Sequence, residues 1–455
     1  MLLIVILTYF TLTLGTKVSD LPTVRRYYAP IQGKYIVGIS DSANTTTESI
    51  LSAVGARPNV IYSHGFHGFG ANLTEAQVKK LSNNPNVGFV EQDAVTLQSS
   101  GGEHSDVYHV DSIWNRTAMY RSNTNKSRGI ARRRFPFGGK GSKKFPRRQL
   151  VIQKPAPWAL ARISERKPHR TKYTYHKSAG VGSCVYVIGT GFNADSPEFE
   201  GRAESIKDFG SSDSGRKQGR GTGVAAIIGS ITYGVAKNTK IFDVNIGNDK
   251  GETEVSRIVQ GIDFVTKDAP SRDCPKGVVV HISSLPTSVA FDKAIDSLTM
   301  SLPFRVFPVV GAGDNGELFP SMPIPSDTPL CVVGGVNRDD ILGPWSNHGP
   351  YIHLFAPGGH VNSINSNDKP EVYTGTDMAS AHVAGLGAYL MGFDLPGGSL
   401  CSYMQVSGIQ NAIDMQMRRN SHSNNILINN RVLNYDPFEF KISLRPVKRS
   451  RLRKE

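Results

Sequence analysis

Residues 373–390 read YTGTDMASAHVAGLGAYL, a turn of small residues that leads directly into an alanine-rich helix. Several hydrolases present a nucleophilic hydroxyl group at such a helix N-terminus, where backbone N–H groups and the helix dipole favour developing negative charge. This chain has Asp377 there, and a carboxylate offers no hydroxyl. Whether the chain is an enzyme therefore depends on the residues elsewhere that would assist a nucleophile.

The chain around this helix alternates short apolar runs with helical stretches. The runs indicate buried strands and are CVYVIG (184–189), KIFDVNI (240–246), GVVVHIS (277–283), FRVFPVVGAG (304–313), LCVVGG (330–335) and YIHLFAPG (351–358). Buried strands that alternate with helices predict a parallel β-sheet covered by helices on both faces, which is an α/β fold. We expect this domain to cover residues 155–435.

A smaller domain is expected at residues 26–98. Its strand signals are KYIVGIS (34–40), NVIYSHGFHGF (59–69) and VGFVEQDAVTL (87–97), and its helix signals are TTESILSAVGA (46–56) and LTEAQVKKL (73–81). Thr74 is a suitable cap for the second helix, and Asn-Asn-Pro ends that helix. The order of signals predicts a compact, ferredoxin-like β-α-β-β-α-β arrangement.

The positive charge of the chain is concentrated in two segments. Residues 116–154 contain 13 Lys and Arg without an Asp or Glu, and residues 441–455 contain 7 Lys and Arg against one Glu. Their combined charge exceeds the net charge of +14, so the basic character belongs to these two segments and says nothing about a binding face on the core. Residues 99–154 also lack periodicity and predict a disordered linker, and residues 436–455 predict a basic tail.

The first residues indicate export from the cell. MLLIVILTYFTLTLG (1–15) is an apolar run too short to span a bilayer and placed where a secretory signal belongs, so we expect a secreted, extracellular protein without a membrane span. In that compartment the four cysteines are candidates for disulfides, with three pairings possible: Cys184, Cys274, Cys331 and Cys401. Four sequons predict N-glycosylation at Asn44, Asn72, Asn115 and Asn125.

Several longer motifs together carry a family resemblance. They are PAPWALARIS (155–164), SCVYVIGTGFNADSPEFEGRA (183–203), GSITYGVAKNTKIFDV (229–244), CPKGVV (274–279) and GTDMASAHVAGLGAYLMG (375–392). Over residues 155–435 the chain resembles a secreted subtilisin-like serine protease, a subtilase of the proteinase K group. Residues 66–93 resemble the end of the inhibitor-type (I9) prodomain, which in that family assists folding and then caps the active-site cleft. The resemblance also implies the disulfide pairs Cys184 with Cys274 and Cys331 with Cys401.

The resemblance places the family's catalytic positions on unsuitable residues. Gly189 in VIGTG stands where the family has the aspartate that orients the base, and GRGTG places Arg220 at the base histidine and Gly223 at a second histidine. Asp377 stands at the nucleophilic serine and Asp314 at the oxyanion-hole asparagine. Glycine cannot hold an imidazole, arginine cannot accept a proton, and a carboxylate is a poor acyl acceptor. We therefore expect a catalytically degenerate subtilase.

The same positions allow a specific structural prediction. The base and the nucleophile are hydrogen-bonded neighbours in the family, so Arg220 and Asp377 should form a salt bridge, with Gly189 leaving room for the guanidinium. A simpler interpretation of Asp377 is that it serves as a helix N-cap. His382, on the same helix, is expected to pack in the core as the family's structural histidine does.

Two further departures from the family concern ligands. The edge strand that pairs with a substrate peptide reads HISSLP here, and Leu285 and Pro286 replace its glycines, which argues against binding of an extended peptide. His353 in YIHLFAPG replaces an aspartate of the family's strong calcium site, so calcium binding is expected to be weakened or lost. No other cofactor and no metal site are expected.

Three functions remain open at this point. The leading one is a secreted, monomeric pseudoprotease that binds, scaffolds or acts as a decoy for an unknown protein partner, with its own prodomain packed on the core and no role in nucleic-acid binding. The second is a precursor of a cationic peptide released from residues 135–148, between the basic sites at 132–134 and 147–148. The third is an active serine endopeptidase of the family.

Overall fold

The computed structural model describes residues 29–97, 149–165, 167–210, 219–248, 251–318, 330–407, 409–410 and 426–427. The predicted signal segment, the basic tail, Asn115, Asn125 and residues 99–148 of the linker lie outside the described residues. None of the described helices is long and apolar enough to cross a bilayer.

One end of the predicted linker is wrong. The linker was expected to reach residue 154, but residues 150–153 form β5 (Leu150–Gln153), which pairs antiparallel with β6 (Tyr173–His176). The sequence Leu-Val-Ile is a short run of good strand formers, and pairing with β6 stabilises it as a strand.

Among the described residues, nine strands form the main sheet in the order β17-β18-β14-β13-β12-β11-β7-β9-β8. Their bounds are β7 (Ser183–Gly189), β8 (Ala203–Asp208), β9 (Lys240–Asn245), β11 (Gly277–Ile282), β12 (Val306–Gly311), β13 (Cys331–Val336), β14 (Leu354–Pro357), β17 (Ile409–Gln410) and β18 (Ile426–Leu427). From β14 to β8 every neighbouring pair is parallel, which confirms the predicted α/β sheet.

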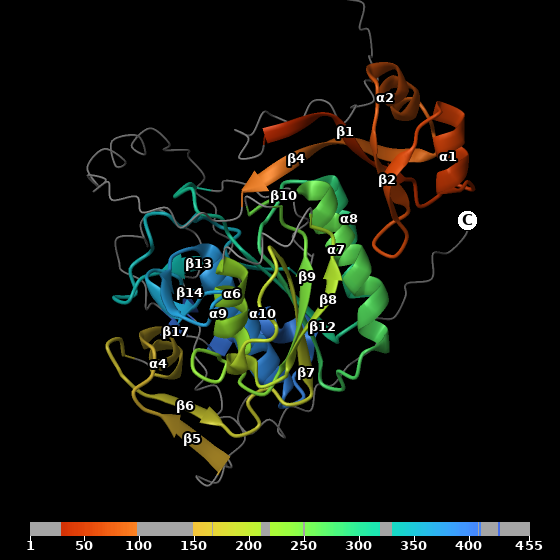
Figure 1. Cartoon of the computed structure of the whole chain (residues 1–455). Coiled ribbons are helices and arrows are strands. Elements are labelled where there is room, and N and C mark those ends of the chain that lie inside the picture. The colour runs from red at the N-terminus through yellow and green to blue at the C-terminus, as the bar shows by residue number, and fades with distance from the viewer. Residues whose placement is uncertain are drawn as a thin grey trace, which may run out of the picture.

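Helices cover both faces of this sheet (Figure 1). α6 (Arg220–Gly229) and α9 (Thr376–Met391) pack in one hydrophobic cluster, and α7 (Val255–Asp268) and α8 (Val289–Ser301) pack in the other. α9 is buried along its whole length. Its small residues make this possible, because a Cβ added at Gly385 would lie 2.8 Å from a Val235 side-chain atom and one at Gly387 would lie 2.5 Å from the Phe307 ring. The remaining helices include α4 (Trp158–Ser164) and α10 (Leu400–Ser407).

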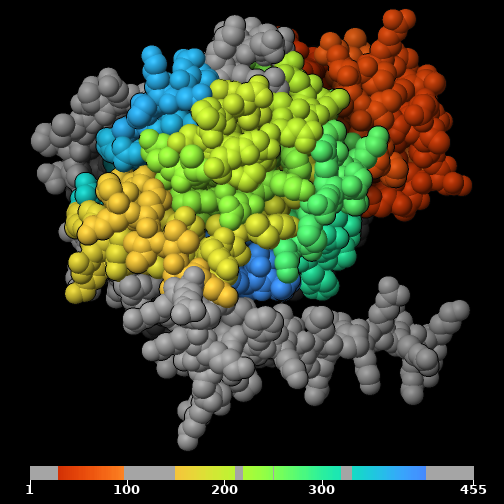
Figure 2. All heavy atoms as spheres, turned by 60° about the horizontal axis from the view of Figure 1, so that its bottom comes forward, coloured from red at the N-terminus to blue at the C-terminus, as the bar shows by residue number. Residues whose placement is uncertain are grey.

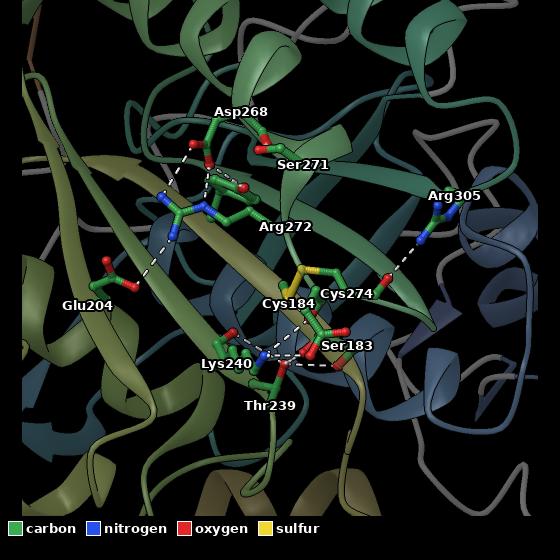
Figure 3. The surroundings of a disulfide bond; sticks show 12 residues. Ser183, Cys184, Glu204, Thr239, Lys240, Asp268, Ser271, Arg272, Cys274 and Arg305 are labelled. Atoms are coloured by element: carbon green, nitrogen blue, oxygen red, sulfur yellow. Dashed lines mark hydrogen bonds and ion pairs between the residues drawn. A yellow bond between two sulfur atoms is a disulfide. The ribbon is translucent and has the colours of Figure 1, made fainter.

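Both implied disulfide pairs are confirmed. Cys184 on β7 is bonded to Cys274, with a Cα–Cα distance of 5.6 Å, and Cys331 on β13 is bonded to Cys401 on α10, with a Cα–Cα distance of 5.7 Å. Figure 3 shows that the first disulfide lies among polar side chains at the end of the sheet, close to Lys240. The first bond ties the loop before β11 to β7, and the second ties α10 to β13.

The N-terminal domain has the predicted β-α-β-β-α-β order. Its elements are β1 (Ala29–Ile39), α1 (Thr47–Val54), β2 (Pro58–Tyr62), β3 (Gly68–Asn72), α2 (Glu75–Ser82) and β4 (Val87–Leu97). The four strands pair antiparallel in the order β4-β1-β3-β2. Thr74 caps α2 as predicted, since its side chain accepts a hydrogen bond from the Gln77 N–H. Figure 2 shows this domain directly against the central part of the chain.

Candidate functional site

Two helices of the core begin beside each other and bring the predicted site residues together. Arg220 is the first residue of α6, and Asp377 is the second residue of α9. Arg220 Nε donates to Asp377 Oδ2 at 2.7 Å and Arg220 Nη2 donates to Asp377 Oδ1 at 2.6 Å. The predicted salt bridge is therefore confirmed, and it has the bidentate geometry that gives the strongest arginine–carboxylate pairs.

Burial and neighbouring charge act in opposite directions on the guanidinium of Arg220. The Asp377 side chain is 0% exposed and that of Arg220 is 13% exposed. Burial alone lowers the pKa of Arg220, but the charges of Asp377 and then Asp314 more than compensate, so the pKa is raised above its ordinary value. A guanidinium held in this way remains a donor and cannot act as a general base.

Gly375 lies at the centre of three charged side chains. A Cβ at this position would lie 2.5 Å from Asp377 Oδ1 and 2.7 Å from Asp314 Oδ2, and it would also collide with Arg220 Nη2. The backbone of Gly375 has φ 155° and ψ 163°, a conformation that side-chain-bearing residues rarely adopt. The site can therefore form only with glycine here.

The N-cap interpretation of Asp377 is wrong. Gly375 occupies the N-cap of α9, and Asp314 Oδ1 accepts the hydrogen bond from the Thr376 N–H at 2.7 Å. Asp377 lies one residue inside the helix, and its Oδ1 also accepts from the Met378 N–H at 2.8 Å. Both carboxylates thus stabilise the positive end of α9, but Asp314 caps its first free N–H.

The space next to Gly189 is not used by the guanidinium, which corrects that part of the prediction. The atoms nearest to a Cβ at Gly189 belong to Ser283 and Val187 and lie at 3.5 Å or more. Arg220 turns instead toward Gly375, and its Nη2 also donates to the carbonyl of Thr374 at 2.9 Å. Gly189 is the last residue of β7, and no Arg220 atom is among the three that lie nearest to a Cβ at this position.

Tyr373 is a site residue that the sequence reasoning missed. It ends β16 (Pro370–Tyr373), which forms a hairpin with β15 (Val361–Ile364). A Cβ at Gly223 would lie 2.6 Å from the Tyr373 ring, so the ring fills the space that a side chain at position 223 would need. The Arg220 guanidinium carbon lies 6.0 Å from the ring centroid. The glycine at position 223, three residues after Arg220, was the signal in the sequence that a side chain from elsewhere fills this space.

Two buried histidines belong to this region: His281 lies against α9, and His382 is part of that helix. His281 Nε2 lies 2.8 Å from Ser380 Oγ, and both residues are 0% exposed. Burial lowers the pKa of His281 to about 4. His382 is 1% exposed, its Nδ1 lies 2.8 Å from the Met378 carbonyl oxygen, and burial lowers its pKa to about 4 as well. His382 thus has the core position that was predicted.

The N-terminal domain occupies an edge of the core. β10 (Glu252–Glu254) pairs antiparallel with β4, and this adds a strand of the core to the sheet of the N-terminal domain. Asp93, which is 0% exposed, accepts from the Ser256 N–H at 3.0 Å at the start of α7, and Glu91 accepts from the Ala290 N–H at 3.1 Å at the start of α8. Burial raises the pKa of Glu91 to about 7. The two carboxylates therefore dock the domain onto the positive ends of two core helices.

Comparison with known proteins places the chain in a family. A model described as the Subtilase family matches residues 180–427. Proteinase T of Parengyodontium album is 41% identical over 62% of this chain and 94% of that protein, and the cuticle-degrading protease of Metarhizium anisopliae is 33% identical over 84% of this chain and 86% of that protein. The chain belongs to the subtilase family.

Two further comparisons agree with this family and concern the prodomain and the overall fold of the subtilase. A model described as Peptidase inhibitor I9 matches residues 35–96, so the N-terminal domain is an I9 prodomain. A solved structure of a cold-adapted subtilisin-like serine proteinase superposes with a TM-score of 0.53 at 28% identity, and it covers 60% of this chain and 98% of that chain. The predicted fold class, a subtilisin-like parallel sheet preceded by an α+β prodomain, is confirmed.

The remaining predicted site residues lie apart from the salt bridge. His353 Nδ1 accepts from the Val332 N–H at 3.1 Å, and burial lowers its pKa, so the imidazole supports β13. Across the described part of the chain, no three His, Cys, Asp or Glu side chains are grouped as metal ligands would be. Residues 284–288, which include Leu285, form neither helix nor strand. Asn44 and Asn72 are exposed, and their glycosylation stays a prediction.

Proposed function

We propose that this subtilase hydrolyses no peptide bonds and acts by binding. The observation that carries the proposal is the buried, bidentate salt bridge between Arg220 and Asp377. In this proposal the two residues stand at the family's base and nucleophile, so the atoms that would exchange a proton are instead locked in an ion pair. Removal of the nucleophile or the base from a serine protease lowers turnover on the order of 10⁶-fold.

The other two substitutions act in the same direction. Asp314, in place of an oxyanion-hole amide, brings a negative charge to where a tetrahedral intermediate would develop one, and loss of a single donor there costs on the order of 100- to 1000-fold. Its Oδ1 already accepts from the Thr376 N–H, so the carboxylate is held at the start of α9. Gly189 can neither orient nor stabilise an imidazolium.

An inactive site has a consequence for the prodomain. Since the chain cannot cut itself, prodomain and core remain joined unless another protease cleaves the segment between them. The pairing of β4 with β10 then leaves the prodomain on the edge of the core. We therefore propose a secreted, two-domain binding protein, with a scaffold or decoy role toward a protein partner.

An activity-based fluorophosphonate probe tests the proposal on the secreted full chain. Proteinase T serves as the positive control, and intact mass shows whether prodomain and core are joined. We expect no label, no cleavage of a casein substrate and one continuous chain. Labelling of the wild-type protein that disappears in Ser380→Ala would identify an alternative nucleophile and overturn the proposal, and so would substrate cleavage that is lost in Asp377→Ala.

A further inference from the structure

β5 has a free edge with a defined set of backbone groups. The N–H groups of Thr174 and His176 on β6 donate to side chains on the side away from β5, at 2.9 Å each. Their partners on β5, Ile152 and Leu150, are therefore the non-hydrogen-bonded pairs of this ribbon. Their own N–H and C=O groups point to the outer edge, where no described residue pairs with them. Figure 1 shows β5 at the margin of the molecule with β6 beside it.

Three of the four side chains of this edge strand are apolar and accessible. Leu150 is 36% exposed, Val151 is 39% exposed and Ile152 is 61% exposed. Folded proteins normally cover or charge an edge of this kind, because unpaired backbone groups next to aliphatic side chains recruit further strands. This edge thus fits an added strand that brings its own apolar face.

A segment of the same chain has the matching pattern. Residues 437–446 read PFEFKISLRP, in which Phe438, Phe440, Ile442 and Leu444 alternate with polar residues and prolines stand at both ends. Strict alternation over seven residues is the signal of a half-buried strand. We propose that residues 438–444 dock in cis on the outer edge of β5 as a third strand.

The length of chain is sufficient for this. β18 ends at Leu427, and the 11 residues from there to Phe438 can span up to about 36 Å. α4 packs against both β6 and β14, and β14 is the neighbour of β18. Three strand spacings of about 5 Å (β18 to β14, β6 to β5 and β5 to the added strand) and two helix contacts of about 10 Å add up to roughly 35 Å, just within this reach. A tethered segment within reach has an effective concentration on the order of millimolar, which favours it over a second copy of the chain.

Amide hydrogen exchange tests the docking at single residues. The full chain is compared with chains that end at residue 436 or at residue 444; the second lacks only the basic end. We expect the amides of Leu150 and Ile152 to exchange at least 10-fold more slowly in the full chain and in the 444 variant than in the 436 variant. Val151 and Gln153, which β6 already protects, should be unchanged. Equal exchange in all three chains would overturn the proposal.

Cross-linking tests the alternation and the source of the strand without truncation. Ile152→Cys is combined in turn with Phe440→Cys, Lys441→Cys, Ile442→Cys and Ser443→Cys; the native cysteines are already in disulfides. We expect intramolecular disulfides to form at positions 440 or 442 at least 5-fold faster than at 441 and 443. Disulfide-linked dimers would assign the edge to a second copy, and equal rates at all four positions would exclude a strand. Either result refutes docking in cis.

Discussion

The salt bridge between Arg220 and Asp377 should make a large and measurable contribution to stability, which a double-mutant cycle isolates. The variants are Arg220→Met, Asp377→Asn and the two combined. At about 4 Å between charge centres and an effective dielectric constant of about 20, the attraction is about 4 kcal/mol. When Asp377 is neutralised, Asp314 remains close to Arg220 and still attracts it, so the measured coupling energy is smaller than the full attraction. We expect a coupling energy of about 2 to 3 kcal/mol.

The single variants should differ in a defined order. Arg220→Met leaves the Asp377 carboxylate, 0% exposed, without its partner and should cost about 3 to 5 kcal/mol. Asp377→Asn leaves a guanidinium that is 13% exposed and still has acceptors, so the cost should be about 1 to 2 kcal/mol. Urea unfolding of the disulfide-intact protein, analysed by linear extrapolation, measures each free energy of unfolding.

A second ion pair in the core provides a matched control. Arg162 Nε and Nη2 donate to the two carboxylate oxygens of Asp340 at 2.6 Å and 2.7 Å, and both residues are buried. The cycle with Arg162→Met and Asp340→Asn should give a coupling at least as large as that of the site. A coupling below about 0.5 kcal/mol at Arg220, with the control pair strongly coupled, would refute the account of the site as a buried ion pair.

Three further outcomes follow from the structure. Burial raises the pKa of Glu91 from 4.5 to about 7, so the native state binds more protons than the unfolded state in that range. The stabilisation present below pH 4.5 should therefore be lost, by up to about 3 kcal/mol, as the pH rises through about 7. Urea unfolding between pH 4.5 and 8 measures this fall in the free energy of unfolding, and Glu91→Gln should flatten it. Replacing both Cys331 and Cys401 by serine opens a 70-residue loop and should lower the free energy of unfolding by about 4 kcal/mol. An unchanged free energy of unfolding would contradict this and would mean that the unfolded chain is equally compact with and without the disulfide. Gly375→Ala should cost more than about 3 kcal/mol because its Cβ would collide with three charged groups, whereas Gly201→Ala, at φ 74° with open space around it, should cost about 1 kcal/mol in the same thermal or urea titration.

The sequence predicted those parts of the fold that depend on local pattern. The buried central strands follow from continuous apolar runs, and the caps of the prodomain helices follow from single threonines. β8 was missed because its sequence, AESIKD, is polar and only partly buried at the edge of the sheet. An edge strand of this kind obtains its conformation from pairing with β9 along its length, and this pairing has no signature within the strand itself.

The salt bridge of the site could be predicted from the sequence, but the contacts around that salt bridge could not. The resemblance implied that positions 220 and 377 face each other, and opposite charges then implied the salt bridge. The capping of α9 by Asp314 and the filling of space at Gly223 by Tyr373 depend on the angle at which separate elements meet. The guanidinium also turned toward Gly375 rather than toward Gly189, because two carboxylates and a backbone carbonyl lie on that side.

The polar network around Arg220 and Asp377 stabilises the fold at the centre of the molecule. A protease active site contains polar groups, including hydrogen-bond donors, whose partner charge forms only during the reaction. Such groups commonly destabilise the protein when no substrate is bound. Here Arg220 bonds both oxygens of Asp377 and a backbone carbonyl, and Asp314 bonds the start of α9. In the proposed function, the groups at the family's catalytic positions are thus bonded to one another and hold the starts of α6 and α9 together. A molecule built in this way can present a stable outer surface, and under the proposed binding function the exposed face of the prodomain is where a partner is to be sought.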